Sequence, residues 1–107
     1  MANEIIIREA ATRMDGVSLF LAGGTEKVFK GPPSPLHRKQ IIITNEDDTR
    51  RLHLVRKGVS STSGNAKLMT IYPNESKVIF TSDDVTVANL NAAGTSAELQ
   101  VIEVFYK

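Results

Sequence analysis

The chain has 107 residues, which is enough for one domain around a single core but leaves little room for a deep cleft as well. Its formal net charge of +1 offers no overall attraction to nucleic acid, and the absence of cysteine excludes disulfides, thiolate metal sites and cysteine nucleophiles, as in a protein made in a reducing cytosol. No apolar run approaches the ~20 residues of a membrane helix, and the N-terminal MANEIIIREA lacks the pattern of a signal peptide.

The first third of the sequence contains short apolar runs between turn residues. We expect three strands here, at residues 4–8, 17–21 and 26–29. Gly23-Gly24 is a clear turn signal. Residues 31–36 (GPPSPL) contain three prolines, which cannot donate hydrogen bonds to a sheet, so a stiff extended connector is predicted. This connector separates an N-terminal arm, residues 1–36, from a core, residues 37–107, within one domain overall.

The remaining sequence repeats the same pattern more regularly. Six further strands are expected, at residues 39–45, 51–56, 66–72, 76–81, 85–90 and 97–106. The 3.6-residue period of an amphipathic helix is nowhere sustained. The prediction is therefore an all-β protein, a two-sheet antiparallel β-sandwich or jelly roll with an extended N-terminal arm.

The last predicted strand breaks the alternation of apolar and polar residues. Leu99 and Val101 share one face, whereas Ile102, Val104 and Tyr106 share the other. Two explanations are open: a bulge near Val101-Ile102 switches the faces, or both faces are covered. A strand covered on both faces in so small a protein suggests a partner.

Residues 46–51 (EDDTRR) form a charged cluster between two strands. Asp47 and Asp48 could act as paired carboxylates, with Arg50 and Arg51 as anion holders and His53 as a base. The alternative is the turn of a hairpin, because Asp and Asn side chains bond to nearby backbone amides. We expect the hairpin turn, with a basic exit suited to docking, and we predict a protein that is not an enzyme.

Other chemistry is weakly supported by the sequence. The two histidines have no metal-ligand spacing, and Asp83-Asp84 lacks the further ligands of a calcium loop. No glycine-rich phosphate loop is present, and no aromatic residue interleaves with the basic residues 50–57 as stacking on single strands would require. We expect no cofactor, no metal, no nucleic-acid partner and no membrane partner.

Charge is unevenly distributed along the chain. Residues 1–67 carry 11 Lys/Arg and 7 Asp/Glu, a net of +4, and residues 68–107 carry 2 and 5, a net of −3. Scatter on a solvated surface is one interpretation. The other is a pair of complementary patches that steer assembly between neighbouring copies.

Several short motifs recur in a characteristic order. They are IIITN at 41–45, RRLHL at 50–54, NAKL at 65–68, IYPNES at 71–76, VTVA at 85–88 and AELQVIEV at 97–104. This order resembles a group of small β-sandwich virion structural proteins of tailed bacteriophages, which serve in capsid decoration, neck or tail, over about 60% of the chain. The first 39 residues depart from the group's pattern, with KGPPSP at 30–35 in place of a T-A-P-A-G-x lead-in.

The resemblance implies a virion protein made in the cytoplasm of a bacterial host. The first hypothesis is a capsid decoration (cement) protein that binds across subunits of the major capsid protein, as a homo-oligomer with a trimer as one arrangement. The alternatives are a neck or tail connector or fibre-anchoring protein, and a carbohydrate- or receptor-binding module. For the last, the aromatic residues that could form a platform look mostly buried. The predicted contact residues are Ile5, Ile6, Ile7, Arg8, Pro32, Pro33, Pro35, Arg50, Arg51, Arg56 and Lys57.

Overall fold

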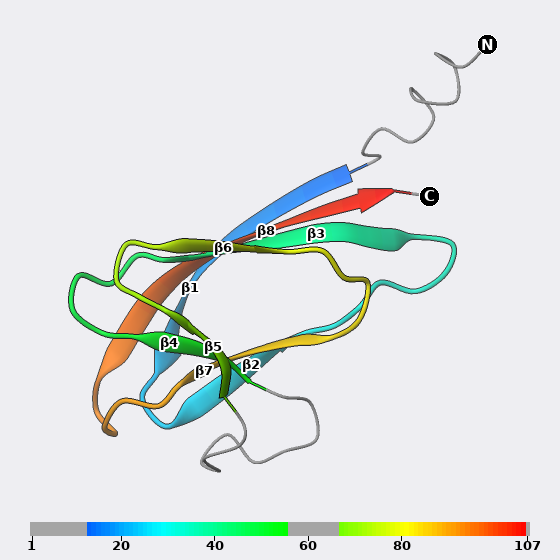
Figure 1. The fold of residues 1–107 in the computed structure, drawn as a ribbon. Helices are drawn as coiled ribbons and strands as arrows, with labels where there is room; N and C mark the ends of the chain where they lie inside the picture. The colour runs from blue at the N-terminus through cyan, green and yellow to red at the C-terminus, as the bar shows by residue number, and fades with distance from the viewer. Residues whose placement is uncertain (1–12, 56–66, 107) are drawn as a thin grey trace.

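Eight strands make up most of the described chain, residues 13–55 and 67–106 of a computed structural model (Figure 1). They are β1 (Arg13–Ala22), β2 (Thr25–Phe29), β3 (His37–Asn45), β4 (Leu52–Val55), β5 (Lys67–Ile71), β6 (Ser76–Ile79), β7 (Val85–Asn89) and β8 (Ser96–Tyr106). The described residues contain no helix, and hence none that could cross a membrane. The strand predicted at residues 4–8 lies outside this range. The other eight predicted strands are confirmed, with ends within two residues except that β1 starts four residues earlier.

The strands form two antiparallel four-stranded sheets that face each other. Sheet A has the order β1-β8-β3-β6 and sheet B the order β2-β7-β4-β5. Of the consecutive strands, β4 and β5 pair with each other, and every other connection passes from one sheet to the other. Two facing sheets with crossing connections are the arrangement of a jelly roll, so the predicted fold class is confirmed.

The first two strands belong fully to the sandwich. β1 pairs with β8 along ten residues, and β2 pairs with β7 along five. Leu21 of β1 and Phe29 of β2 lie in the core. The sandwich therefore begins at β1 rather than at residue 37, and the proline-containing segment is an internal connection between β2 and β3.

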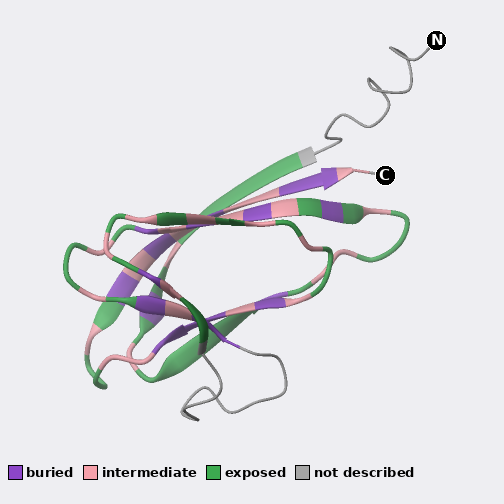
Figure 2. Cartoon of the chain, viewed as in Figure 1, coloured by how far each residue is buried: buried purple, intermediate pink, exposed green. Residues whose placement is uncertain are grey.

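The core consists of side chains that alternate residues of the strands direct between the two sheets. Figure 2 shows buried segments along the strands of both sheets. Ile41 and Ile43 of β3 alternate with the less buried Ile42, as expected for a strand with one face inward. The larger aliphatic residues that are fully buried come from both sheets: Ile41, Ile43, Leu52, Ile71, Val87, Leu99 and Val101. Each such side chain contributes about 1.5–3 kcal/mol to folding.

Two tight turns depend on particular residues. Gly24 has a φ of 79°, which favours glycine, and a Cβ on Gly23 would lie 2.1 Å from the carbonyl oxygen of Ala92. In the β5–β6 connection, Asn74 adopts a φ of 60°, which Asn tolerates better than most residues. The predicted Gly23-Gly24 turn is confirmed, and each of the two turns joins strands of different sheets.

Candidate protein interface

The predicted contact residues within the described chain lie at the two ends of β3. Pro32, Pro33 and Pro35 belong to the connection that enters β3, here called the proline loop (residues 30–36). Arg50 and Arg51 belong to the connection that leaves β3, here called the charged turn (residues 46–51). Nine strand residues at about 3.3 Å each separate these two groups by roughly 30 Å. The remaining candidates lie outside the described residues: Ile5, Ile6, Ile7, Arg8, Arg56 and Lys57.

The charged turn is a structural loop, but it is not the hairpin that we predicted. It connects β3 in sheet A to β4 in sheet B. The carboxylate of Asp47 accepts hydrogen bonds from the backbone N–H groups of Thr49 (3.0 Å) and Arg50 (2.6 Å). These two bonds hold the pKa of Asp47 below its usual value, and the bond from Thr49 has the larger effect. Asp47 therefore stabilises the loop as a carboxylate.

Two buried asparagines anchor the loops at this end of the sandwich. The side-chain nitrogen of Asn45 donates to the carbonyl oxygens of Arg50 (2.8 Å) and Ile71 (3.0 Å). The side-chain nitrogen of Asn89, at the end of β7, donates to the carbonyl of Leu21 (2.8 Å). Both asparagines are fully buried. The sequence marks them as turn-forming residues, but nothing in it shows that they are buried.

Arg51 is the described basic candidate best placed to meet a partner. Its side chain is exposed, and its guanidinium carbon lies 5.1 Å from the centre of the Tyr72 ring. This cation–π contact positions the charge while leaving it accessible. Arg50, by contrast, is half-buried and lies 3.5 Å from Asp47. Of the two described arginine candidates, Arg51 is therefore the one whose charge is accessible.

Arg38 has the most heavily hydrogen-bonded side chain in the described part of the molecule, and it was not among the predicted site residues. Arg38 at the start of β3 has a side chain that is 0% exposed. Its guanidinium donates to the Glu103 carboxylate on β8 (3.0 Å), to the carbonyl of Phe29 (2.8 Å) and to the carbonyl of Asp83. It also reaches the carbonyl of Lys30 (3.2 Å). Arg38 therefore joins β8, the proline loop and the β6–β7 connection.

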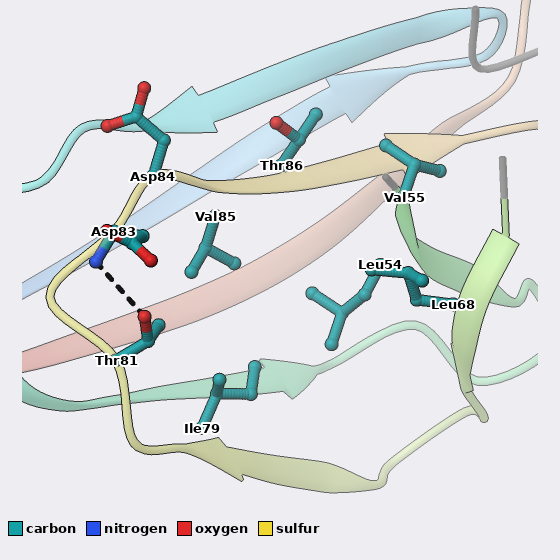
Figure 3. Close-up of a pocket in the computed structure, with 9 residues that line it drawn as sticks. All are labelled: Leu54, Val55, Leu68, Ile79, Thr81, Asp83, Asp84, Val85 and Thr86. Carbon is teal, nitrogen blue, oxygen red and sulfur yellow. Dashed lines mark hydrogen bonds between the residues drawn. The ribbon is translucent and has the colours of Figure 1, made fainter. Parts of the chain in front are cut away.

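A pocket of about 550 Å³ opens beside β4, β6 and β7 (Figure 3). Leu54, Ile79 and Val85 point toward one another from these strands and make its wall largely apolar. Asp83 and Asp84 lie at its edge, on the connection that enters β7. A pocket of this size with largely apolar walls suits a small apolar group.

One of the two acidic residues at the pocket edge, Asp84, holds the proline loop. The Asp84 carboxylate accepts a hydrogen bond from the N–H of Gly31 (2.8 Å) and lies 3.6 Å from the ammonium of Lys30. Within residues 13–55 and 67–106 there is no group of three side chains that could hold a metal ion. His37 stacks on Tyr106, with ring centres 5.6 Å apart, on sheet A, whereas His53 lies on sheet B.

The outer face of sheet A is apolar across its middle. Ile102 of β8 lies between Gly16 of β1 and Ile42 of β3, and Ile42 lies beside Val78 of β6. We call these four residues the apolar row. Ile102 and Ile42 are partly exposed, and Val78 is 48% exposed. An exposed apolar area on a sheet face marks an interaction surface more often than chance.

The apolar row also resolves the two explanations for β8. β8 pairs with β1 without any shift in register at Val101 and Ile102, so the bulge that was one of the two explanations is absent there. The irregularity lies in β3 instead, between Arg38 and Gln40. β8 is a central strand whose two faces are both apolar: Val101 enters the core, and Ile102 faces outward.

A pair of carboxylates lies at the end of the same outer face. The pKa of Glu98 is raised, first by a hydrogen bond with the Glu46 side chain and then by partial desolvation and the negative charge of Glu46. Glu98 lies opposite Phe20 of β1. The outer face of sheet A therefore changes from acidic at one end to apolar in the middle.

More aromatic rings are exposed than the sequence suggested. Phe20 is 70% exposed, Phe80 71% and Tyr72 48%, which corrects the expectation that most aromatic residues are buried. These three rings come from different strands or connections, β1, β6–β7 and β5–β6. They do not share a strand on which to form one platform.

Comparisons with known proteins support the fold and go no further. No protein-family model matches the chain, and no curated protein sequence matches it. Its structure is similar to the cupin domain of an XRE-family transcriptional regulator from Enterobacter cloacae, with a TM-score of 0.58 and 12% identity over 84% of this chain and 79% of that chain. It is also similar to a chain of Bacillus endospore appendages, described as disulfide-linked pili, with a TM-score of 0.48 and 16% identity over 89% and 88%. The first likeness supports the β-sandwich.

Proposed function

We propose that the protein is a non-enzymatic structural protein of a tailed-bacteriophage virion, and first a capsid decoration protein. The observation that supports the structural role is the apolar outer face of sheet A. Its middle is formed by the central strand β8, whose other face contributes to the core. Such a face is costly in water and gains free energy when another protein covers it. The resemblance of residues 40–103 to virion proteins supports a virion, in which such proteins occupy several locations.

The positions of the two loops fit a protein that binds across neighbouring subunits. The proline loop and the charged turn lie roughly 30 Å apart, at opposite ends of β3. A single copy can therefore contact one capsid subunit through each end. A protein that binds the assembled shell better than free subunits stabilises the shell by mass action. Arg51, exposed on the charged turn, is the first contact to test.

The deciding measurement is the number of copies per virion. We would purify virions and quantify this chain against the major capsid protein by mass spectrometry with labelled peptide standards. Hundreds of copies support capsid decoration, because a shell offers many equivalent sites. About 6–12 copies move the protein to a ring at the neck or tail, the second candidate location. Absence from virions refutes the virion role altogether.

A binding measurement then tests the surface. Purified protein should bind expanded capsids that lack it, and Arg51→Glu should weaken this binding at low salt by about tenfold, with less effect at high salt. Lys27→Glu, an exposed charge change within β2 of sheet B and outside both loops, serves as the control. Equal effects of both changes would contradict a specific role of Arg51.

A further inference from the structure

β1 differs from the three other edge strands of the described sheets. β2, β5 and β6 have four or five residues, and each carries a lysine: Lys27, Lys67 and Lys77. Short strands and lysines are common devices that stop an edge from pairing with another chain. β1 has ten residues and neither lysine nor proline, and residues 16–22 (GVSLFLA) carry no charge. This edge lacks the protection that the other three have.

The side chains of β1 also remain unusually exposed for their type. Met14 is 66% exposed, Val17 48% and Phe20 70%, and Figure 2 shows most of the strand as exposed. β8 pairs with one side of β1 along all ten residues. On its other side, β1 has no neighbouring strand within the part of the chain that the structure describes. An uncovered row of backbone donors and acceptors beside apolar side chains is a template for strand addition.

The sequence gives this chain no obvious means of covering the edge itself. Every strand of the described chain already belongs to sheet A or sheet B, and none of them lies on the free side of β1. Residues 1–12 precede β1 directly, so they could pair with it only after a reversal near residues 9–12. That segment reads EAAT and contains none of Gly, Pro, Asn or Asp, the residues that favour reversals. A second copy of the chain is the better occupant.

We propose that β1 pairs antiparallel with β1 of a second copy, about a two-fold axis at Val17, so that two A sheets join into one. In this register Val17 lies opposite Val17 of the second copy, and Met14 lies opposite Phe20. The Met14–Phe20 contact occurs twice, once on each side of the axis, and brings together the two most exposed large apolar side chains of the strand. Gly16 lies opposite Ser18, so no bulky pair opposes the approach. Moving the axis by one residue would leave Phe20 opposite Thr12 or Met14 opposite Ala22.

The inference goes beyond the virion role, because it concerns the chain by itself. The full-length protein is expected to have about twice the 11.7 kDa chain mass by light scattering, across a dilution series. Phe20→Lys should raise the dissociation constant about 100-fold, roughly tenfold for each of two equivalent contacts. Phe80→Lys is a matched control, since Phe80 is 71% exposed but follows β6 on the opposite edge of sheet A. Circular dichroism verifies that both variants fold.

A covalent probe tests the register independently of any loss of folding. Because the chain has no cysteine, Val17→Cys places a single thiol on the axis, and opposite Cα atoms of an antiparallel pair lie within disulfide range. Mild oxidation should give a disulfide-linked dimer. Val78→Cys, equally exposed at 48% but on β6, should not crosslink at a comparable rate.

Three results would overturn this inference. A monomer or a trimer mass excludes a two-fold dimer, and equal crosslinking of the two cysteine variants excludes the β1 edge. A dimer that survives Phe20→Lys but is lost when residues 1–12 are deleted assigns the contact to the N-terminal segment instead. None of these results bears on the copy number in virions, so the virion role and the β1 pairing fail separately.

Discussion

Replacing Arg38 with methionine should destabilise the protein more than any surface change. Methionine has a similar length but cannot donate hydrogen bonds. The substitution leaves the Glu103 carboxylate without its partner at 3.0 Å, and it leaves the carbonyls of Phe29, Lys30 and Asp83 without a donor. Since the Arg38 side chain is 0% exposed, water does not readily replace it.

The magnitude follows from the burial of the two partners. Removing one member of a buried ion pair costs about 3–5 kcal/mol, because the other charge remains buried without compensation. Glu103 keeps a side-chain exposure of 20%, so its carboxylate stays partly hydrated and the lower end of that range applies. We expect a loss of about 3 kcal/mol, which for a domain of this size corresponds to roughly 15 °C in melting temperature.

Urea unfolding followed by far-ultraviolet circular dichroism, at one fixed protein concentration, measures this loss. Arg51→Met is the matched control: it removes an exposed arginine and its contact with Tyr72, and should cost about 1 kcal/mol or less. The double variant Arg38→Met/Glu103→Leu should recover part of the loss, since it removes the stranded charge. A cost for Arg38→Met no larger than that of Arg51→Met would refute the reasoning.

Three further predictions concern single side chains. Asp47→Ala should lower the free energy of unfolding by about 1 kcal/mol at neutral pH and by progressively less below pH 3.8. The reason is that the lowered pKa of Asp47 gives a stabilisation that is lost as the carboxylate protonates. Melting temperatures measured across pH test this, with Asp48→Ala, at an exposed position, as the control. Glu98→Gln should have a higher melting temperature than the wild type at neutral pH, and the difference should close toward pH 4. The reason is that the raised pKa of Glu98 means that the protein loses stability as Glu98 ionises beside Glu46. A wild type with the higher melting temperature at pH 7 would contradict this. Asn89→Ala should cost about 2 kcal/mol in urea unfolding, since it removes a buried donor, and a change within 0.5 kcal/mol would exclude an anchoring role.

The strands could be predicted from the sequence because their signals are local. Runs such as IIITN and SKVIF, set between turn residues, define where the backbone extends, and the structure agrees closely. The pairing of strands could not be read in the same way. β3 and β4 follow each other like the arms of a hairpin, yet their partners are β6 and β8 for β3 and β5 and β7 for β4. The six-residue charged turn is longer than a tight hairpin loop, which was the available signal.

Arg38 could not be predicted as buried from the sequence, because one extra residue in β3 reverses which side chains face inward. Counting back from the buried Ile41 by twos, strict alternation directs Lys39 inward and Arg38 outward. The irregularity between Arg38 and Gln40 inserts one extra residue into β3 and reverses that assignment. Arg38 therefore meets Glu103 on the inner face of β8. A bulge depends on the pairing with a distant strand, so the sequence around it does not reveal it.

The apolar residues of β8 differ from Arg38, because their pattern is visible in the sequence. Its structural cause, however, follows only from the pairing of β8 within the sheet. The pattern allowed a bulge or a strand covered on both faces, and the continuous register with β1 excludes the bulge. With Val101 in the core, Ile102 must face away from it, and both neighbours of Ile102 continue the apolar row rather than cover it. Covering this row requires a second protein surface, whereas extending sheet A at β1 requires a second strand. The two requirements are independent, so one molecule can pair through its edge and still present its outer face to a larger assembly.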